Sequence, residues 1–107
     1  MHKNKTISKI KIADTISPKL GFRDSAADFF HRIEQSNSDI IKIDFENVVF
    51  ISRSFAHEYL KQSKKSKKEI IPINQPENVN SMFEAIIEST KNPKKFKVKP
   101  VETISLT

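Results

Sequence analysis

The sequence contains no cysteine and only one glycine among its 107 residues. The absence of cysteine excludes disulfide bonds and thiolate metal sites, and it favours a reducing compartment. A single glycine leaves few positions for turns with positive φ, which argues against a hairpin-rich all-β fold. The same scarcity excludes the glycine-rich phosphate loops of P-loop and dinucleotide-binding proteins.

Long apolar runs are also missing. No apolar stretch approaches the roughly 18 residues that a membrane-spanning helix needs. Residues 1–11 are dotted with lysines and lack the apolar core of a signal peptide. We therefore expect a cytoplasmic protein with no membrane association.

The composition that remains, 36% hydrophobic and 30% charged, is typical of one globular domain. We expect a single domain over residues 1–107 with its core at about 21–90. Residues 1–20 then form an N-terminal strand and a connection, and residues 91–107 form a basic strand or tail.

The most informative stretch is residues 40–60. Ile40, Ile41 and Ile43 put apolar groups on both faces of a strand of about 40–45, which is typical of a central parallel strand covered on each side. Asp44 and Asn47 bracket a polar turn. Residues 48–51 then lead to a helix start that bears two serines.

Three helices are expected from apolar stripes at helical spacing. The first begins at a cap on Asp24 or Ser25 and ends near Gln35. The second runs over about 54–63, and the third begins at a cap on Asn74 or Gln75 and ends before Pro93. In the second helix the pattern turns Phe55, Ala56, Tyr59 and Leu60 inward and His57, Glu58 and Lys61 outward.

Strands are expected at 7–12 and 70–73, and residues 95–99 alternate as an edge strand or a tail. The segment 16–22, with Pro18 and Gly21, is expected to be a connection. Strands that alternate with helices imply mostly parallel pairing and right-handed crossovers. The fold class is therefore α/β, with a mostly parallel sheet of about four strands and about three helices.

Catalytic and metal-binding patterns are weak. His2, His31 and His57 share no ligand spacing with carboxylates, so no metal site is expected. Ser54, His57 and Asp44 can be assembled into a triad on paper, but no nucleophile elbow supports it. The sequence argues against an enzyme and indicates no cofactor.

The serine pair and two arginines allow two interpretations each. Ser52 or Ser54 can cap the helix, which stabilises it by about 1 kcal/mol, or Ser54 can accept a phosphate that alters partner docking. Arg23 and Arg53 can pair with carboxylates such as Asp24 or Glu58, or they can bind an anion.

The net charge of +6 is concentrated late in the chain. Ten lysines stand against four glutamates between Lys61 and Lys99. This excess indicates either an acidic partner or nucleic acid, bound through Lys61 to Lys68 and Lys91 to Lys99, or solvated lysines that keep a small domain soluble. Little arginine or aromatic interleaving accompanies these lysines, which favours the second interpretation.

The stretch Asp44-Phe45-Glu46-Asn47-Val48-Val49-Phe50-Ile51, followed by a serine-bearing helix start, resembles the STAS domain of sulfate transporters and anti-sigma-factor antagonists. The chain is more similar to the bacterial and archaeal STAS-like family of unassigned function. The motifs that carry this similarity are Gly21-Phe22-Arg23, Ser54-Phe55-Ala56-His57-Glu58 and Pro72-Ile73-Asn74.

The resemblance implies a small sheet with helices packed mainly on one face. In anti-sigma-factor antagonists a partner kinase, which is also an anti-sigma factor, phosphorylates the helix start and is thereby released. The acceptor position falls on Ser54. Where those antagonists have Asp-Ser-Ser/Thr-Gly, this chain has Ser52-Arg53-Ser54-Phe55, which changes the charge and shape of the docking surface.

The favoured interpretation is a non-enzymatic STAS-like regulatory module. It would bind a protein partner, such as a histidine-kinase-like ATPase or a sigma-factor regulator, through Ser52, Arg53, Ser54, Phe55 and Glu58. The alternative is a basic module that binds nucleic acid or an acidic partner through its two lysine-rich segments. The sequence leaves the oligomeric state open.

Overall fold

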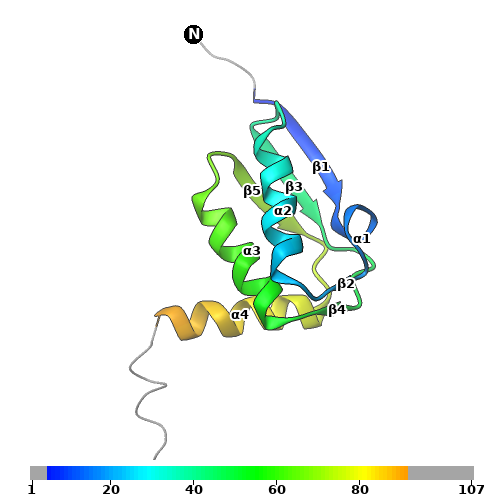
Figure 1. Cartoon of the computed structure of the whole chain (residues 1–107), viewed down its shortest axis with the longest axis vertical. Helices are drawn as coiled ribbons and strands as arrows, with labels where there is room; N and C mark the ends of the chain where they lie inside the picture. The colour runs from blue at the N-terminus through cyan, green and yellow to red at the C-terminus, as the bar shows by residue number, and fades with distance from the viewer. Residues whose placement is uncertain (1–4, 92–107) are drawn as a thin grey trace, which may run out of the picture.

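The computed structural model describes residues 5–91 and shows an α/β fold (Figure 1). Three strands form its main sheet: β1 (Ile7–Lys11), β3 (Ile40–Asp44) and β5 (Glu69–Ile73). Their order is β1-β3-β5, and both pairings are parallel. β3 is therefore the central strand, as the sequence predicts, and parallel pairing is confirmed.

Two crossover segments connect these strands. The remaining elements follow in chain order: α1 (Ile12–Thr15), β2 (Lys19–Leu20), α2 (Arg23–Glu34), β4 (Phe50–Ile51), α3 (Arg53–Lys65) and α4 (Glu77–Lys91). β2 and β4 form a small second parallel sheet of their own. Three of the about four expected strands form the main sheet, and the pair β2–β4 is an addition that the sequence did not indicate.

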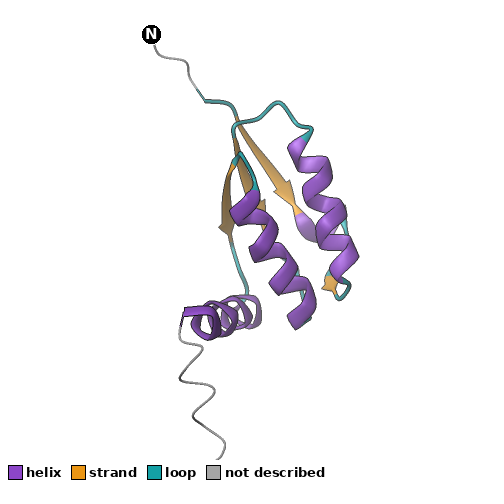
Figure 2. Cartoon of the chain, turned by 60° about the vertical axis from the view of Figure 1, so that its left-hand side comes forward, coloured by secondary structure: helices purple, strands orange, loops and turns teal. Residues whose placement is uncertain are grey.

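The helices cover one face of the main sheet. Because the strand order never reverses, right-handed crossovers place α2 and α3 on the same face, where Figure 2 shows them side by side. Ile41 and Ile43 point into this helical layer and are fully buried. Ile40 and Lys42 lie on the other face and are only half-buried. The expectation that β3 is covered on each side is therefore wrong.

An aromatic cluster joins the helices to the end of the sheet. The Tyr59 ring of α3 stacks on Phe83 of α4 at 5.1 Å between centroids and meets Phe30 of α2 edge-on at 5.3 Å. Phe45, which follows β3, lies edge-on to both Tyr59 and Phe83. These contacts hold α4 across the carboxyl end of the strands, below α2 and α3 in Figure 1.

Two helix starts differ from the prediction. α2 begins at Arg23, and the preceding Phe22 makes no side-chain cap, so neither Asp24 nor Ser25 is the cap. α4 begins at Glu77, where the carbonyl of Pro76 accepts from the backbone of the first turn.

Two short elements, α1 and β2, lie where the sequence predicts a strand end and a connection. The predicted strand at 95–99 lies outside the described residues. No helix within residues 5–91 is long and apolar enough to cross a membrane.

Candidate functional site

The small β2–β4 sheet brings two helix starts together. Leu20 of β2 lies beside Ile51 of β4, and the backbone N–H of Ser52 donates to the Leu20 carbonyl at 2.9 Å. Each strand passes into a helix within three residues, so α2 and α3 begin next to each other and run in the same direction (Figure 1). Arg23 and Arg53 each occupy the first helical position.

Ser52 connects the two starts. Its Oγ accepts from the Phe55 backbone N–H at 3.1 Å, which makes it the N-cap of α3. The same hydroxyl donates to the carbonyl of Gly21 at 2.9 Å. Because the Ser52 proton is used there, the Ser54 hydroxyl is the donor in the 3.3 Å contact between the two serines. Ser52 therefore has a structural role, and Ser54 is the half-buried serine left at the helix start.

Three exposed apolar side chains belong to residues that shortly precede the two helix starts. Phe22 is 78% exposed, Val49 is 64% exposed and Phe50 is 49% exposed. Phe50 lies against Gly21, since a Cβ at Gly21 would stand 3.9 Å from its ring. Large apolar groups that gather on a surface in this way are typical of protein-binding sites.

Sequence analysis treats Val49 and Phe50 only as a lead-in to the helix and does not select Phe22 as a contact residue. The β2–β4 pairing turns Phe50 outward and Ile51 inward. Because this pairing was not predicted, nothing in the sequence indicated that Phe50 would be exposed. Phe22 had no such indication either, because its place before the first residue of α2 became visible only when the structure showed that this helix begins at Arg23.

We call the group of residues at the two helix starts the helix-start surface. Its members are Phe22, Arg23, Val49, Phe50, Arg53 and Ser54.

The charges near this surface are those of Arg23 and Arg53, with the exposed Asp24 in the first turn of α2. The first turn of α3 contains no acidic residue to offset its unpaired N–H groups and helix dipole. Among residues 5–91, neither Arg23 nor Arg53 forms an ion pair, although the charge of Arg23 acts on the buried Glu58. The predicted pairing of either arginine with Asp24 or Glu58 is therefore not formed, and both guanidinium groups remain exposed to solvent.

Two residues of the predicted site are not on the surface. Phe55 is fully buried in the core. Glu58 is 7% exposed, so the expectation that it faces outward is wrong. Its carboxylate accepts from Gln62 Nε2 at 2.7 Å and lies 4.0 Å from Lys61 Nζ. The hydrogen bond from Gln62, followed by the charges of Lys61 and Arg23, lowers the pKa of Glu58, although burial opposes this shift.

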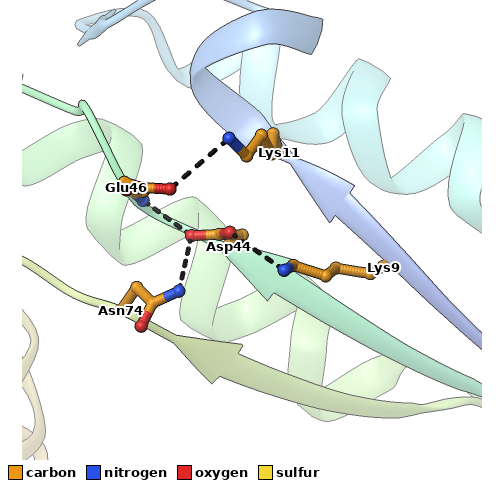
Figure 3. Close-up of polar contacts among 5 residues, drawn as sticks. All are labelled: Lys9, Lys11, Asp44, Glu46 and Asn74. Atoms are coloured by element: carbon orange, nitrogen blue, oxygen red, sulfur yellow. Dashed lines mark hydrogen bonds and ion pairs between the residues drawn. The ribbon is translucent and has the colours of Figure 1, made fainter.

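A second polar cluster lies at the carboxyl ends of the main strands (Figure 3). Asp44 Oδ1 accepts from the Glu46 backbone N–H at 2.8 Å and from Asn74 Nδ2 at 3.1 Å. Asp44 Oδ2 lies 3.6 Å from Lys9 Nζ, and Lys11 Nζ lies 3.4 Å from Glu46. Burial alone would raise the pKa of Asp44, but these hydrogen bonds and lysine charges bring it below its usual value.

This cluster has a structural role. Asp44 is only 1% exposed, and its contacts fasten the turn after β3 to the turn after β5. Asn74, expected to cap α4, instead donates to Asp44 from a backbone with φ of 54°. Among the described residues, no hydrogen bond joins Ser54, His57 and Asp44, so the triad is not assembled. Among residues 5–91, no three His, Asp or Glu side chains gather as metal ligands.

Some lysines of the segment Lys61 to Lys68 are engaged in contacts within the protein. Lys68 Nζ donates to the carbonyls of Ser36 and Ser38 at 2.8 and 2.7 Å, which joins the end of α2 to the start of β5. Lys61 lies beside Glu58, and Lys64 and Lys67 are exposed. Of the second predicted segment, only Lys91 belongs to a described element.

The chain matches no protein-family model, and neither the curated proteins nor the solved structures contain a significant match to it.

Proposed function

We propose that the chain is a non-enzymatic regulatory module that binds a protein partner through the helix-start surface. The observation that carries this proposal is the exposure of Phe22 and Phe50 beside two adjacent helix N-termini. Aromatic side chains supply most of the anchor energy at protein interfaces, because they bury a large apolar area with few rotamers to fix.

The exposed arginines give this surface a polar rim. Arg23 and Arg53 lie at the first positions of α2 and α3, within a few residues of the apolar anchors. Guanidinium groups recognise carboxylates and phosphates in a bidentate way, and they are frequent at interfaces. We therefore expect a partner whose docking face is apolar at its centre and acidic at its edge.

Ser54 is the proposed point of regulation. A phosphate on its hydroxyl would add about two negative charges beside Arg53 and the unpaired N–H groups of α3. The site would tolerate that charge, but the phosphate would offset the charges of Arg23 and Arg53 and so remove the positive charge that attracts an acidic partner. An acidic partner would then be released.

The similarity to STAS-like domains supports the same proposal. Anti-sigma-factor antagonists of that kind carry their phosphoacceptor at the corresponding helix start. The partner class proposed on this basis is a histidine-kinase-like ATPase or a sigma-factor regulator. STAS-like membership and phosphorylation of Ser54 are both part of the proposal.

Affinity capture from the native host tests the proposal. The full chain is compared with Phe50→Ser, which shortens an anchor, and with Ser54→Asp, which mimics the added charge. Captured proteins are identified by mass spectrometry. We expect a discrete partner that the wild type retains and both variants lose.

The controls are Ile7→Ser, an isoleucine of similar exposure on the uncovered sheet face, and Ser81→Asp, an exposed serine on α4. A partner that binds all five proteins equally would refute the surface assignment. Capture dominated by nucleic acid, removed by salt and unchanged by the variants, would support the basic-module alternative instead.

A further inference from the structure

A groove of about 500 Å³ separates the second half of α3 from the C-terminal half of α4. Figure 1 shows α4 running across the lower end of the α2–α3 layer, with its orange C-terminal half extending below α3. The apolar lining of the groove comes from Leu60, Ile86 and Ile87. Ile87 is 41% exposed, so this apolar floor is open to solvent.

The α3 side of the groove is basic. His57, Lys61 and Lys64 line it, each one turn or less from the next, and none of the lining residues is acidic. Glu58 lies near Lys61 but is buried, and the 4.0 Å separation of their charged atoms is long for an ion pair. An apolar floor beside the two lysines Lys61 and Lys64 is complementary to an apolar stripe with carboxylates along one edge.

The basic charge of the groove also indicates which molecule could bind there: residues 92–107 of this chain, a second copy of the chain, or another protein. Residues 92–107 begin at the end of α4, but they contain Lys94, Lys95, Lys97 and Lys99 against a single acid, Glu102. This segment would bring like charge to the basic side of the groove. A second copy of a chain with net charge +6 meets the same repulsion. Both considerations favour an acidic partner.

We propose that this groove binds an acidic amphipathic helix of a protein partner. A helix in a groove between two helices presents apolar residues at i, i+3, i+4 and i+7 to the floor. Its glutamates or aspartates would lie along α3, next to Lys61 and Lys64. The groove shares no residue with the helix-start surface, so this docking site is independent of the proposed function.

A synthetic peptide tests the proposal directly. The probe is a fluorescein-labelled amphipathic peptide of about 18 residues, five helical turns, with leucines on one face and glutamates beside them. Its affinity for the full chain is measured by fluorescence anisotropy. We expect saturable binding, and we expect a peptide with lysine in place of each glutamate to bind at least about tenfold more weakly.

Matched variants locate the binding. Lys64→Glu and Ile87→Gln should each weaken binding by about fivefold to tenfold. Lys67→Glu makes the same charge change in the same lysine run but outside the groove, and Ile7→Gln alters an exposed isoleucine on the sheet. These two controls should bind like the wild type. Circular dichroism verifies that all four variants are folded.

Amide shifts in ¹H–¹⁵N spectra provide a second readout, because they should concentrate in the last turns of α3 and α4. Equal loss with Lys64→Glu and Lys67→Glu would overturn the proposal in favour of diffuse electrostatic binding. Absence of binding, or equal binding of the lysine peptide, would also overturn it. Phe50→Ser does not alter the groove, so failure here is distinguishable from failure of the helix-start surface.

Discussion

The hydroxyl of Ser52 links the two helix starts on which the functional proposal depends. It caps α3 through the Phe55 N–H and reaches across to the Gly21 carbonyl before α2. Within residues 5–91, the hydroxyl of Ser54, two residues later, makes one hydrogen bond, the 3.3 Å contact with Ser52 itself. The two serines look equivalent in the sequence, but the structure divides their roles.

This division predicts different costs of substitution. Ser52→Ala should lower the free energy of unfolding by about 1–2 kcal/mol, since the backbone N–H of Phe55 and the half-buried carbonyl of Gly21 both lose their partner. Ser54→Ala should change it by less than about 0.5 kcal/mol. Urea denaturation of both variants measures the difference. Equal losses would contradict the assignment of Ser52 as the cap.

Asp44 should make stability depend on pH. Its folded pKa lies below its unfolded value of about 3.9, so the charged form stabilises the fold at neutral pH. This contribution is fully present above the unfolded pKa and is lost as the pH falls through the lower, folded pKa.

Asp44→Asn tests this dependence. The stability advantage of the wild type over Asp44→Asn should stay constant from neutral pH down to about 5, and it should shrink below about 4. Asp28→Asn, at an exposed aspartate of α2, serves as control and should show little difference at any pH. An advantage that grows in acid would show that the pKa of Asp44 is raised instead.

Tyr59 offers a stabilising substitution. Its hydroxyl is buried and has no hydrogen-bond partner among the described residues, and burial raises its pKa. Tyr59→Phe keeps the stacked ring and removes the unpaired polar group, so the free energy of unfolding should rise by about 1 kcal/mol. Thermal unfolding measures the change. A clear loss of stability would indicate that the hydroxyl has a partner.

The burial of Glu58 shows what helical spacing can and cannot predict. Glu58 lies three residues after Phe55 and one before Tyr59, so helix geometry places it on the inward side. Its charge favoured the outward assignment in the sequence analysis. Gln62, one turn later, supplies the hydrogen bond that makes burial acceptable, and an i, i+4 pair of this kind is visible in the sequence.

At the scale of elements, the long periodic segments were predictable and the short ones were not. The stripes of α2, α3 and α4 and the apolar run of β3 each cover enough residues to establish a period. α1 and β2 cover four and two residues, which is too few. β2 exists because it pairs with β4, about thirty residues later, and such pairing leaves little trace in the local sequence.

The β2–β4 pair gives a prediction at this scale. Leu20 is fully buried, and its carbonyl accepts from Ser52, so it supports both helix starts. Leu20→Ala should cost about 2–4 kcal/mol of stability and should speed amide exchange at Ser54 and Phe55. Lys19→Ala, at the exposed neighbour, is the control and should do neither. If amide exchange were unchanged in Leu20→Ala, the β2–β4 sheet would not be what stabilises the helix-start surface.

At the scale of the whole molecule, the order of strands determines where function can lie. Because β1, β3 and β5 follow one another without reversal, the helices gather on one face and no crevice forms at a switch point of the sheet. The described chain instead offers two surfaces on α3: the helix-start surface and the groove beside α4. The fold class, the parallel pairing and the central position of β3 followed from the sequence, but these surfaces depend on tertiary contacts.

Photocrosslinking in the native host is the most direct test of the helix-start surface. A photoreactive phenylalanine analogue replaces Phe50 in one protein and Ile7 in another, and crosslinked products are identified by mass spectrometry. We predict a discrete protein adduct from position 50, reduced when Ser54→Asp is added, and none from position 7. Equal adducts from both positions, or no protein adduct from position 50, would contradict partner binding through this surface.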